Sequence, residues 1–215
     1  MESVEEITPN NSDLFYDYII PWLSGILRSS NELIRCKLYS QLSRLFSVAV
    51  KFIELSQAFN EQTESKSFDA SLEEILKEFE SFIYQGLTDA SIHARQAILS
   101  NLVEICMHLG TQRTNDLVLS HSVTYLNHKD PQLRASFFSH ITSLSTIIGP
   151  KSLEQYVLPL LLQSLNDPDE MVIERDLNCL TSLSELGLIR KQKILSILQQ
   201  TLPLIFHPNI WIRKS

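Results

Sequence analysis

Apolar residues recur along this 215-residue chain at the three- and four-residue steps of an amphipathic helix. Two stretches, residues 91–110 and 171–187, carry the pattern most regularly. Their apolar positions are Ala94, Ile98, Leu102, Ile105, Cys106 and Leu109 in the first, and Ile173, Leu177, Leu180, Leu183 and Leu186 in the second. Because such helices bury one face against a neighbour, the pattern predicts an all-α fold.

The pattern repeats about every forty residues. Five stretches each start with an apolar residue, pass through a polar turn and reach a ninth position. They are LRSSNELIR (27–35), LTDASIHAR (87–95), LNHKDPQLR (126–134), LNDPDEMVI (165–173) and IFHPNIWIR (205–213), and we call each a turn motif. Successive motifs begin 60, 39, 39 and 40 residues apart. A nearly fixed period of this length is typical of a helical repeat array.

Glycine and proline mark the limits of the predicted helices. Each of Gly110, Gly149 and Gly187 follows an apolar helical stretch, where glycine adopts the left-handed conformation without steric cost. Three prolines lie inside apolar stretches, where proline bends a helix or occupies its first turn: Pro21, Pro159 and Pro203.

Each unit is therefore expected to be two antiparallel helices, as in a HEAT-type α-solenoid, with about four and a half repeats in a single solenoid over residues 12–215. Helix pairs are predicted at about 12–57, 69–110, 111–149 and 150–187, followed by a truncated fifth pair at 188–215. Residues 58–68 are predicted to be an exposed loop, and residues 1–11 to be disordered or poorly ordered.

The last predicted helix begins at Asn209 and has room for little more than one turn. In a repeat array each unit buries its apolar face against the next. We therefore expect the face of helix 189–206 to lack its cover, as in a segment of a longer solenoid or a truncated product.

Charge and cysteine content narrow the class of protein. The net charge of −7 belongs to residues 1–80, which hold 14 acids and 7 bases, whereas the rest of the chain holds 11 of each. Such a surface does not favour nucleic acid or anionic lipid. Three isolated cysteines suit a reducing compartment. No signal peptide and no apolar run of about 18 residues is present, so we expect a cytosolic or nuclear protein without direct membrane insertion.

Catalytic motifs are absent from the sequence: it has no glycine-rich phosphate loop, no GxSxG and no HExxH. Cys106 and His108 form a lone CxH pair, and we expect Cys106, Cys36 and Cys179 in the core. The DPDE run at 167–170 is expected to form a turn and cap the next helix. We assign no catalytic, cofactor-binding or metal-binding residue and expect no cofactor.

Arginine fills the ninth position of four turn motifs: Arg35, Arg95, Arg134 and Arg213. We favour ion pairs with an acid of the adjacent repeat over a ligand-binding series, because stacked repeats meet through equivalent faces. Ile173 interrupts the series, and Arg175 would replace it if the preceding turn were longer.

Two further features could contact a partner. The basic run RKQK (190–193) is a modest candidate for an acidic partner, although a solvated helix face is the simpler interpretation. Trp22 and Trp211 are expected to be packing residues, exposed only where a neighbouring repeat is missing.

Four segments, TNDLVLSH, LNHKDPQLRASFF, CLTSLSELGLIRK and HPNIWIR, resemble the regulatory, pseudokinase-bearing subunit of the class III phosphatidylinositol 3-kinase complex. The resemblance covers about residues 85–213 and is thin over 1–84, where only YIIPWL and the helix-pair pattern fit. It concerns the HEAT-repeat region alone, since that family also has a kinase-like domain and a propeller, and neither signature occurs here. Asp176 departs from the family, where a small apolar residue is usual.

The resemblance implies a non-catalytic scaffold that supports assembly of the lipid kinase complex in endosomal trafficking and autophagy. The implied partners are the lipid kinase catalytic subunit and its coiled-coil partner subunits. The implied location is cytoplasmic, at endosomal or autophagic membranes through the complex. Two alternatives stay open: a protein-binding HEAT module of another family, such as a phosphatase scaffold or transport adaptor, and an enzyme with a site built from scattered residues.

Overall fold

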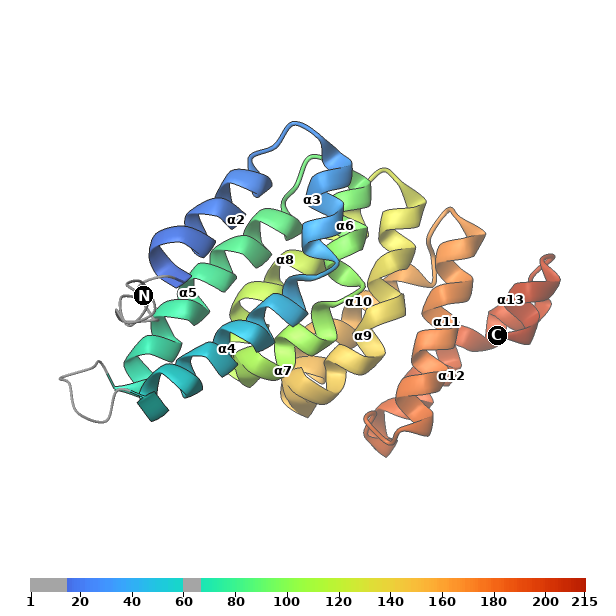
Figure 1. The fold of residues 1–215 in the computed structure, drawn as a ribbon. Coiled ribbons are helices and arrows are strands. Elements are labelled where there is room, and N and C mark those ends of the chain that lie inside the picture. The colour runs from blue at the N-terminus through green and yellow to red at the C-terminus, as the bar shows by residue number, and fades with distance from the viewer. Residues whose placement is uncertain (1–14, 60–66) are drawn as a thin grey trace, which may run out of the picture. The chain divides into compact units, whose positions relative to one another are not determined.

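A computed structural model describes residues 15–59 and 67–215. These residues form helices and no strands, which confirms the predicted all-α solenoid class of packed helix pairs (Figure 1). Contacts divide the chain into two compact units, residues 1–101 and 102–215, called here the N-terminal and C-terminal units. The number of repeats and the limits of the pairs stay predictions.

In its described residues, the N-terminal unit contains a π-helical turn and five helices: η1 (Phe15–Ile19), α2 (Ile20–Leu27), α3 (Glu32–Tyr39), α4 (Leu42–Phe59), α5 (Phe68–Leu87) and α6 (Ile92–Leu99). Helix α3 packs against α2 and α6, and α5 packs against α4 and α6. The core is aromatic: the Phe79 ring centroid lies 4.8 Å from that of Phe46 and 5.7 Å from that of Phe82, both edge to face.

The C-terminal unit is built from α7 (Leu102–Arg113), η2 (Thr114–Leu119), α8 (Ser120–Ser122), η3 (Val123–Asn127), α9 (Pro131–Ser152), η4 (Leu153–Val157), α10 (Leu158–Ser164), α11 (Glu170–Glu185), α12 (Lys191–Thr201), η5 (Leu202–Phe206) and α13 (Ile210–Lys214). Helix α9 lies between α7 and α11, and α11 also contacts α10 and α13.

The polar turns fix where the second helix of each pair begins. The fifth residue of every turn motif is an N-cap whose side chain accepts a hydrogen bond from a backbone N–H of the first helical turn. These caps are Asn31, Ser91, Asp130, Asp169 and Asn209. Since a cap satisfies a donor that the helix leaves unpaired, the common position gives the five helices a common register.

The glycine and proline predictions agree with the backbone. Gly110, Gly149 and Gly187 have φ of 75°, 84° and 68°, and the first two interrupt helical geometry within α7 and α9. The three prolines occupy first-turn positions of α2, α10 and η5, the second of the two expected arrangements.

Two expectations need correction, and a third concerns residues that the structure does not describe. The helix predicted over 91–110 is broken at Ser100 and Asn101 into α6 and α7, although all six of its apolar positions are buried. Leu186, the last apolar position of the second stripe, is exposed because it is the C-cap of α11. The predicted N-terminal segment and residues 60–66 of the predicted loop lie outside the described residues.

No helix in the described ranges is both long enough and apolar enough to cross a bilayer.

Candidate functional site

Ion pairs of the same geometry connect the first turn motif to the second and the third to the fourth. In the N-terminal unit, Arg35 Nε and Nη2 donate to Asp89 Oδ2 and Oδ1 at 2.8 and 3.0 Å. In the C-terminal unit, Arg134 Nε and Nη2 donate to Asp167 Oδ2 and Oδ1, both at 2.8 Å. Paired parallel hydrogen bonds of this kind fix orientation as well as distance. The structural role predicted for Arg35 and Arg134 is therefore confirmed.

The acidic partner occupies the third position of its motif and also shapes its own turn. Asp89 Oδ1 accepts a hydrogen bond from the N–H of Ser91, and Asp167 Oδ1 accepts one from the N–H of Asp169, each at 2.8 Å. Each arginine in turn donates through Nη1 to the carbonyl of the third residue of its own motif, which is Ser29 for Arg35 at 2.6 Å. In each pair, one carboxylate therefore holds its own turn and also binds the arginine of another turn motif.

Burial and hydrogen bonding act in opposite directions on the pKa of the Asp89 carboxyl group. Burial alone raises the pKa of Asp89, but hydrogen bonds from Arg35 and from the N–H of Ser91 outweigh it, so the pKa lies below its ordinary value. The hydrogen bond with Asp89 raises the pKa of Arg35 despite partial burial. Both side chains of the pair are therefore charged throughout the neutral range.

The arginine series ends differently in the last motif. Arg213 Nη1 donates to the carbonyls of His207 and Pro208, at 2.7 and 2.8 Å. Ile173 is buried in the core, and Arg175 is exposed on α11. Because Asp169 caps α11 at the usual fifth position, the preceding turn is not longer, and the idea that Arg175 replaces the missing arginine is wrong.

The cysteines are distributed between core and boundary. Cys106 and Cys179 are buried as predicted, and burial raises the pKa of each thiol to about 12. Cys36 is only half-buried, contrary to prediction. His108 is exposed, away from Cys106, and no cluster of three metal-ligating side chains occurs in the described ranges.

The DPDE run forms the turn expected of it. Asp167 binds Arg134, Asp169 caps α11, and Glu170 accepts a hydrogen bond from the amide of Asn209 at 2.5 Å. In the basic run, Arg190 pairs with Glu154 at 3.1 Å, and Lys191 and Lys193 are exposed at the start of α12.

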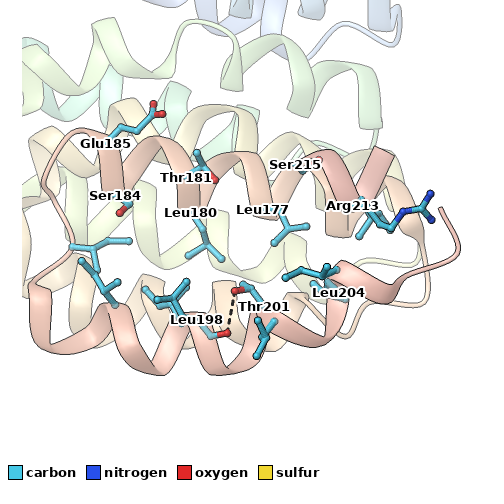
Figure 2. Close-up of a pocket in the computed structure, with 16 residues that line it drawn as sticks. Leu177, Leu180, Thr181, Ser184, Glu185, Leu198, Thr201, Leu204, Arg213 and Ser215 are labelled. Carbon is cyan, nitrogen blue, oxygen red and sulfur yellow. Dashed lines mark hydrogen bonds between the residues drawn. The ribbon is translucent and has the colours of Figure 1, made fainter. Parts of the chain in front are cut away.

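An apolar groove of about 360 Å³ lies between α11 and the segment formed by α12 and η5 (Figure 2). Leu177 and Leu180 of α11 face Leu198 and Leu204 across it. Ile212 of α13 also lines the groove. No residue of α12 or η5 is buried, which agrees with the expectation that this helical face lacks a cover. Trp211 beside it is 63% exposed, and Trp22 in the other unit is 66% exposed.

The opposite face of α11 holds a buried acid. Asp176 is 0% exposed, and neither carboxyl oxygen has a hydrogen-bond partner. Burial raises its pKa to about 9, so the group is a neutral carboxylic acid at pH 7. The aspartate singled out in the sequence is thus a buried acid without a hydrogen-bond partner.

The sequence of the whole chain, residues 1–215, matches the family model described as PIK3R4-like, middle domain. The chain belongs to this family. Relatives include the probable serine/threonine-protein kinase vps15 of Dictyostelium discoideum, 34% identical over 99% of this chain, and the serine/threonine-protein kinases Vps15 of Schizosaccharomyces pombe and Saccharomyces cerevisiae, 36% and 35% identical over 100% of it. The resemblance stated from the sequence, to the helical region of this regulatory subunit, is confirmed.

The middle domain is a small part of these family members. The chain spans 12%, 14% and 16% of the length of the three relatives. The word kinase in their names therefore describes proteins several times longer than this chain.

Proposed function

We propose that this chain is a non-catalytic HEAT scaffold segment of the class III phosphatidylinositol 3-kinase regulatory subunit. It supports assembly of the lipid kinase complex that acts in endosomal trafficking and autophagy. The observation that carries the proposal is the match of all 215 residues to the middle domain of the PIK3R4-like family. The partners are the lipid kinase catalytic subunit and its coiled-coil subunits, and the location is the cytoplasmic side of endosomal and autophagic membranes, reached through the complex.

The character of the surface supports a binding role. The polar groups that converge in the turns are used for packing: Asp89 and Asp167 are held by arginine, and Asp169 caps a helix. The open surfaces, by contrast, are apolar grooves along helices, such as the one between α11 and α12. Grooves of this kind accept helices, whereas a catalytic site needs titratable groups directed into a cleft.

The alternative left open by the sequence, a protein-binding HEAT module of another family, is wrong, because all 215 residues match the PIK3R4-like middle domain.

The proposal is tested by a pull-down from cytosol with the 215-residue chain as bait, read by mass spectrometry. We expect the lipid kinase catalytic subunit or its coiled-coil partners among the proteins retained. If a bait that circular dichroism shows to be helical retains none of them, the segment is no docking scaffold. Phosphate transfer by the purified chain alone would also contradict the proposal.

A further inference from the structure

The outer face of α3 and α4 combines an exposed apolar seam with regularly spaced bases. Ser40 and Gln41 alone separate the two helices. The N–H of Gln41 donates to the carbonyl of Leu38 at the end of α3, and the N–H of Leu45 donates to that of Gln41 at the start of α4. In Figure 1, the chain bends between α3 and α4, and α5 lies alongside α4. The face therefore follows this bend, and α4 supplies its longer straight part, about five turns.

Apolar residues follow a seven-residue repeat along this face. The positions alternate by four and three residues, as a and d positions do in a coiled coil, with one polar member; they are Ile34, Leu38, Gln41, Leu45, Val48, Phe52 and Leu55. Leu38 is buried, but Ile34 is 46%, Val48 60% and Leu55 58% exposed. Exposed apolar residues at this spacing can pack against the apolar face of another helix.

Beside the seam lies an apolar groove of about 450 Å³ between α2 and α3. Trp22 and Ile26 of α2 and Leu33 of α3 line it, and it runs onto the seam at Leu45. Leu33 is 73% exposed and Trp22 66% exposed, so large side chains are held at the protein surface. Helix grooves of this kind bind the apolar face of an amphipathic helix.

The charge beside the seam has one sign. Lys37, Arg44 and Lys51 are exposed and lie seven residues apart, each directly before an apolar seam residue, where coiled coils place the charges that select a partner. Residues 18–53 contain a single acid, Glu32, which faces α6, where it accepts a hydrogen bond from Ser91 Oγ at 2.8 Å. This acid-poor stretch lies within a third of the chain that carries 14 acids and 7 bases.

We propose that the face formed by Lys37, Arg44, Lys51 and the adjoining seam is a docking surface for an acidic amphipathic helix of another polypeptide. The helix would place apolar residues on the seam and carboxylates opposite the three bases. This inference rests on the scaffold role proposed above and adds the surface and the class of partner. A helix is favoured over an anionic membrane because the three bases, seven residues apart, form a single line beside an apolar seam, which matches one helix better than a broad negative surface.

The test uses the 215-residue chain and a designed peptide of about three heptads, with leucine at a and d and glutamate at e and g. Binding is measured by isothermal titration calorimetry at low and moderate salt. We expect binding of the glutamate peptide, none of a matched lysine peptide, and an affinity at least about tenfold lower for the triple variant K37E/R44E/K51E. The triple variant should instead bind the lysine peptide.

A matched variant, K191E/K193E/K214E, makes the same change of net charge at three exposed lysines of the other unit and should bind the glutamate peptide as the natural chain does. A second variant, L33S/V48S, removes exposed apolar groups and should weaken binding without changing helicity. Equal binding of the glutamate peptide by the natural chain and the triple variant overturns the inference. So does sedimentation of the natural chain, but not the triple variant, with vesicles of phosphatidylcholine and phosphatidylserine, because it would assign the stripe to a membrane.

The outcome is separable from that of the scaffold proposal. If the natural chain and K37E/R44E/K51E retain the lipid kinase complex equally in the pull-down, the scaffold role stands and this surface is wrong. If neither retains it while the peptide binding follows charge, the surface stands and the proposed complex is wrong.

Discussion

The carboxyl group of Asp89 connects two turn motifs by binding Arg35, which lies 54 residues earlier in the chain, and it also accepts a hydrogen bond from the N–H of Ser91. Asp89→Ala would leave the guanidinium of Arg35, 14% exposed, without its acidic partner. We expect a loss of about 2–4 kcal/mol in the free energy of unfolding, because breaking a mostly buried pair costs far more than removing a surface charge. Urea unfolding followed by circular dichroism measures it.

The control is Asp116→Ala, which removes an exposed carboxyl group and should change the free energy of unfolding by less than about 0.5 kcal/mol. Equal effects of the two substitutions would show that the ion pair contributes nothing beyond a surface charge.

Asp176 makes stability depend on pH in the opposite sense from an ordinary carboxylate. Its pKa is about 9 in the folded chain against 3.8 without burial, so the folded state holds the proton more tightly. Below about pH 4 the group is protonated in both states, and its contribution to the free energy of unfolding is at its maximum. That contribution falls as pH rises toward 9, by as much as ~1.4 kcal/mol per pH unit. We expect Asp176→Asn to flatten this slope and to be the more stable protein at pH 8.

Urea unfolding of both proteins at pH 5, 6.5 and 8 tests the prediction. Parallel pH profiles for the natural chain and Asp176→Asn would mean that the carboxyl group is solvated in the folded state.

Gly86 of α5 lies against side chains of both α3 and α6. A Cβ atom there would lie 2.7 Å from Cδ1 of Ile98 and 2.8 Å from Cε1 of Tyr39, closer than carbon atoms pack. We expect Gly86→Ala to lower the free energy of unfolding by about 1–3 kcal/mol, because the buried side chains of Tyr39 and Ile98 must shift. The melting temperature measured by circular dichroism should fall accordingly.

Gly25 is the matched control, since it is also helical and a Cβ there meets nothing within 4 Å. Gly25→Ala should leave stability unchanged or raise it by up to about 1 kcal/mol through helix propensity. A stabilising Gly86→Ala would contradict the close packing of these three helices.

At the scale of elements, the sequence predicted what depends on local chemistry. The cap in the DPDE run and the Arg35 and Arg134 pairs occupy fixed positions of the turn motif. The glycines of positive φ lie outside the motifs but recur 39 and 38 residues apart, so each occurrence supports the others. The break at Ser100 and Asn101 was missed because neither residue is a helix breaker like glycine or proline. The half-buried Cys36 was missed because periodicity identifies a buried face without saying whether a neighbour covers it.

At the scale of the whole molecule, the chain is a middle segment built from repeated helix pairs, with apolar grooves left open in each of its two compact units. An open apolar groove on a repeat protein is a site where a further repeat of the same protein packs or where another protein binds. Its docking surfaces could not be predicted from hydrophobic periodicity, because exposed and buried apolar residues follow the same spacing. They became visible only when the exposed fractions of residues such as Leu33 and Val48 were known.

The most direct test of the scaffold role mixes the purified 215-residue chain with the purified class III lipid kinase catalytic subunit and measures their elution by size-exclusion chromatography with light scattering. The account predicts a stable complex with the mass of one copy of each. Separate elution of the two proteins, with the chain helical by circular dichroism and the kinase active, would contradict it.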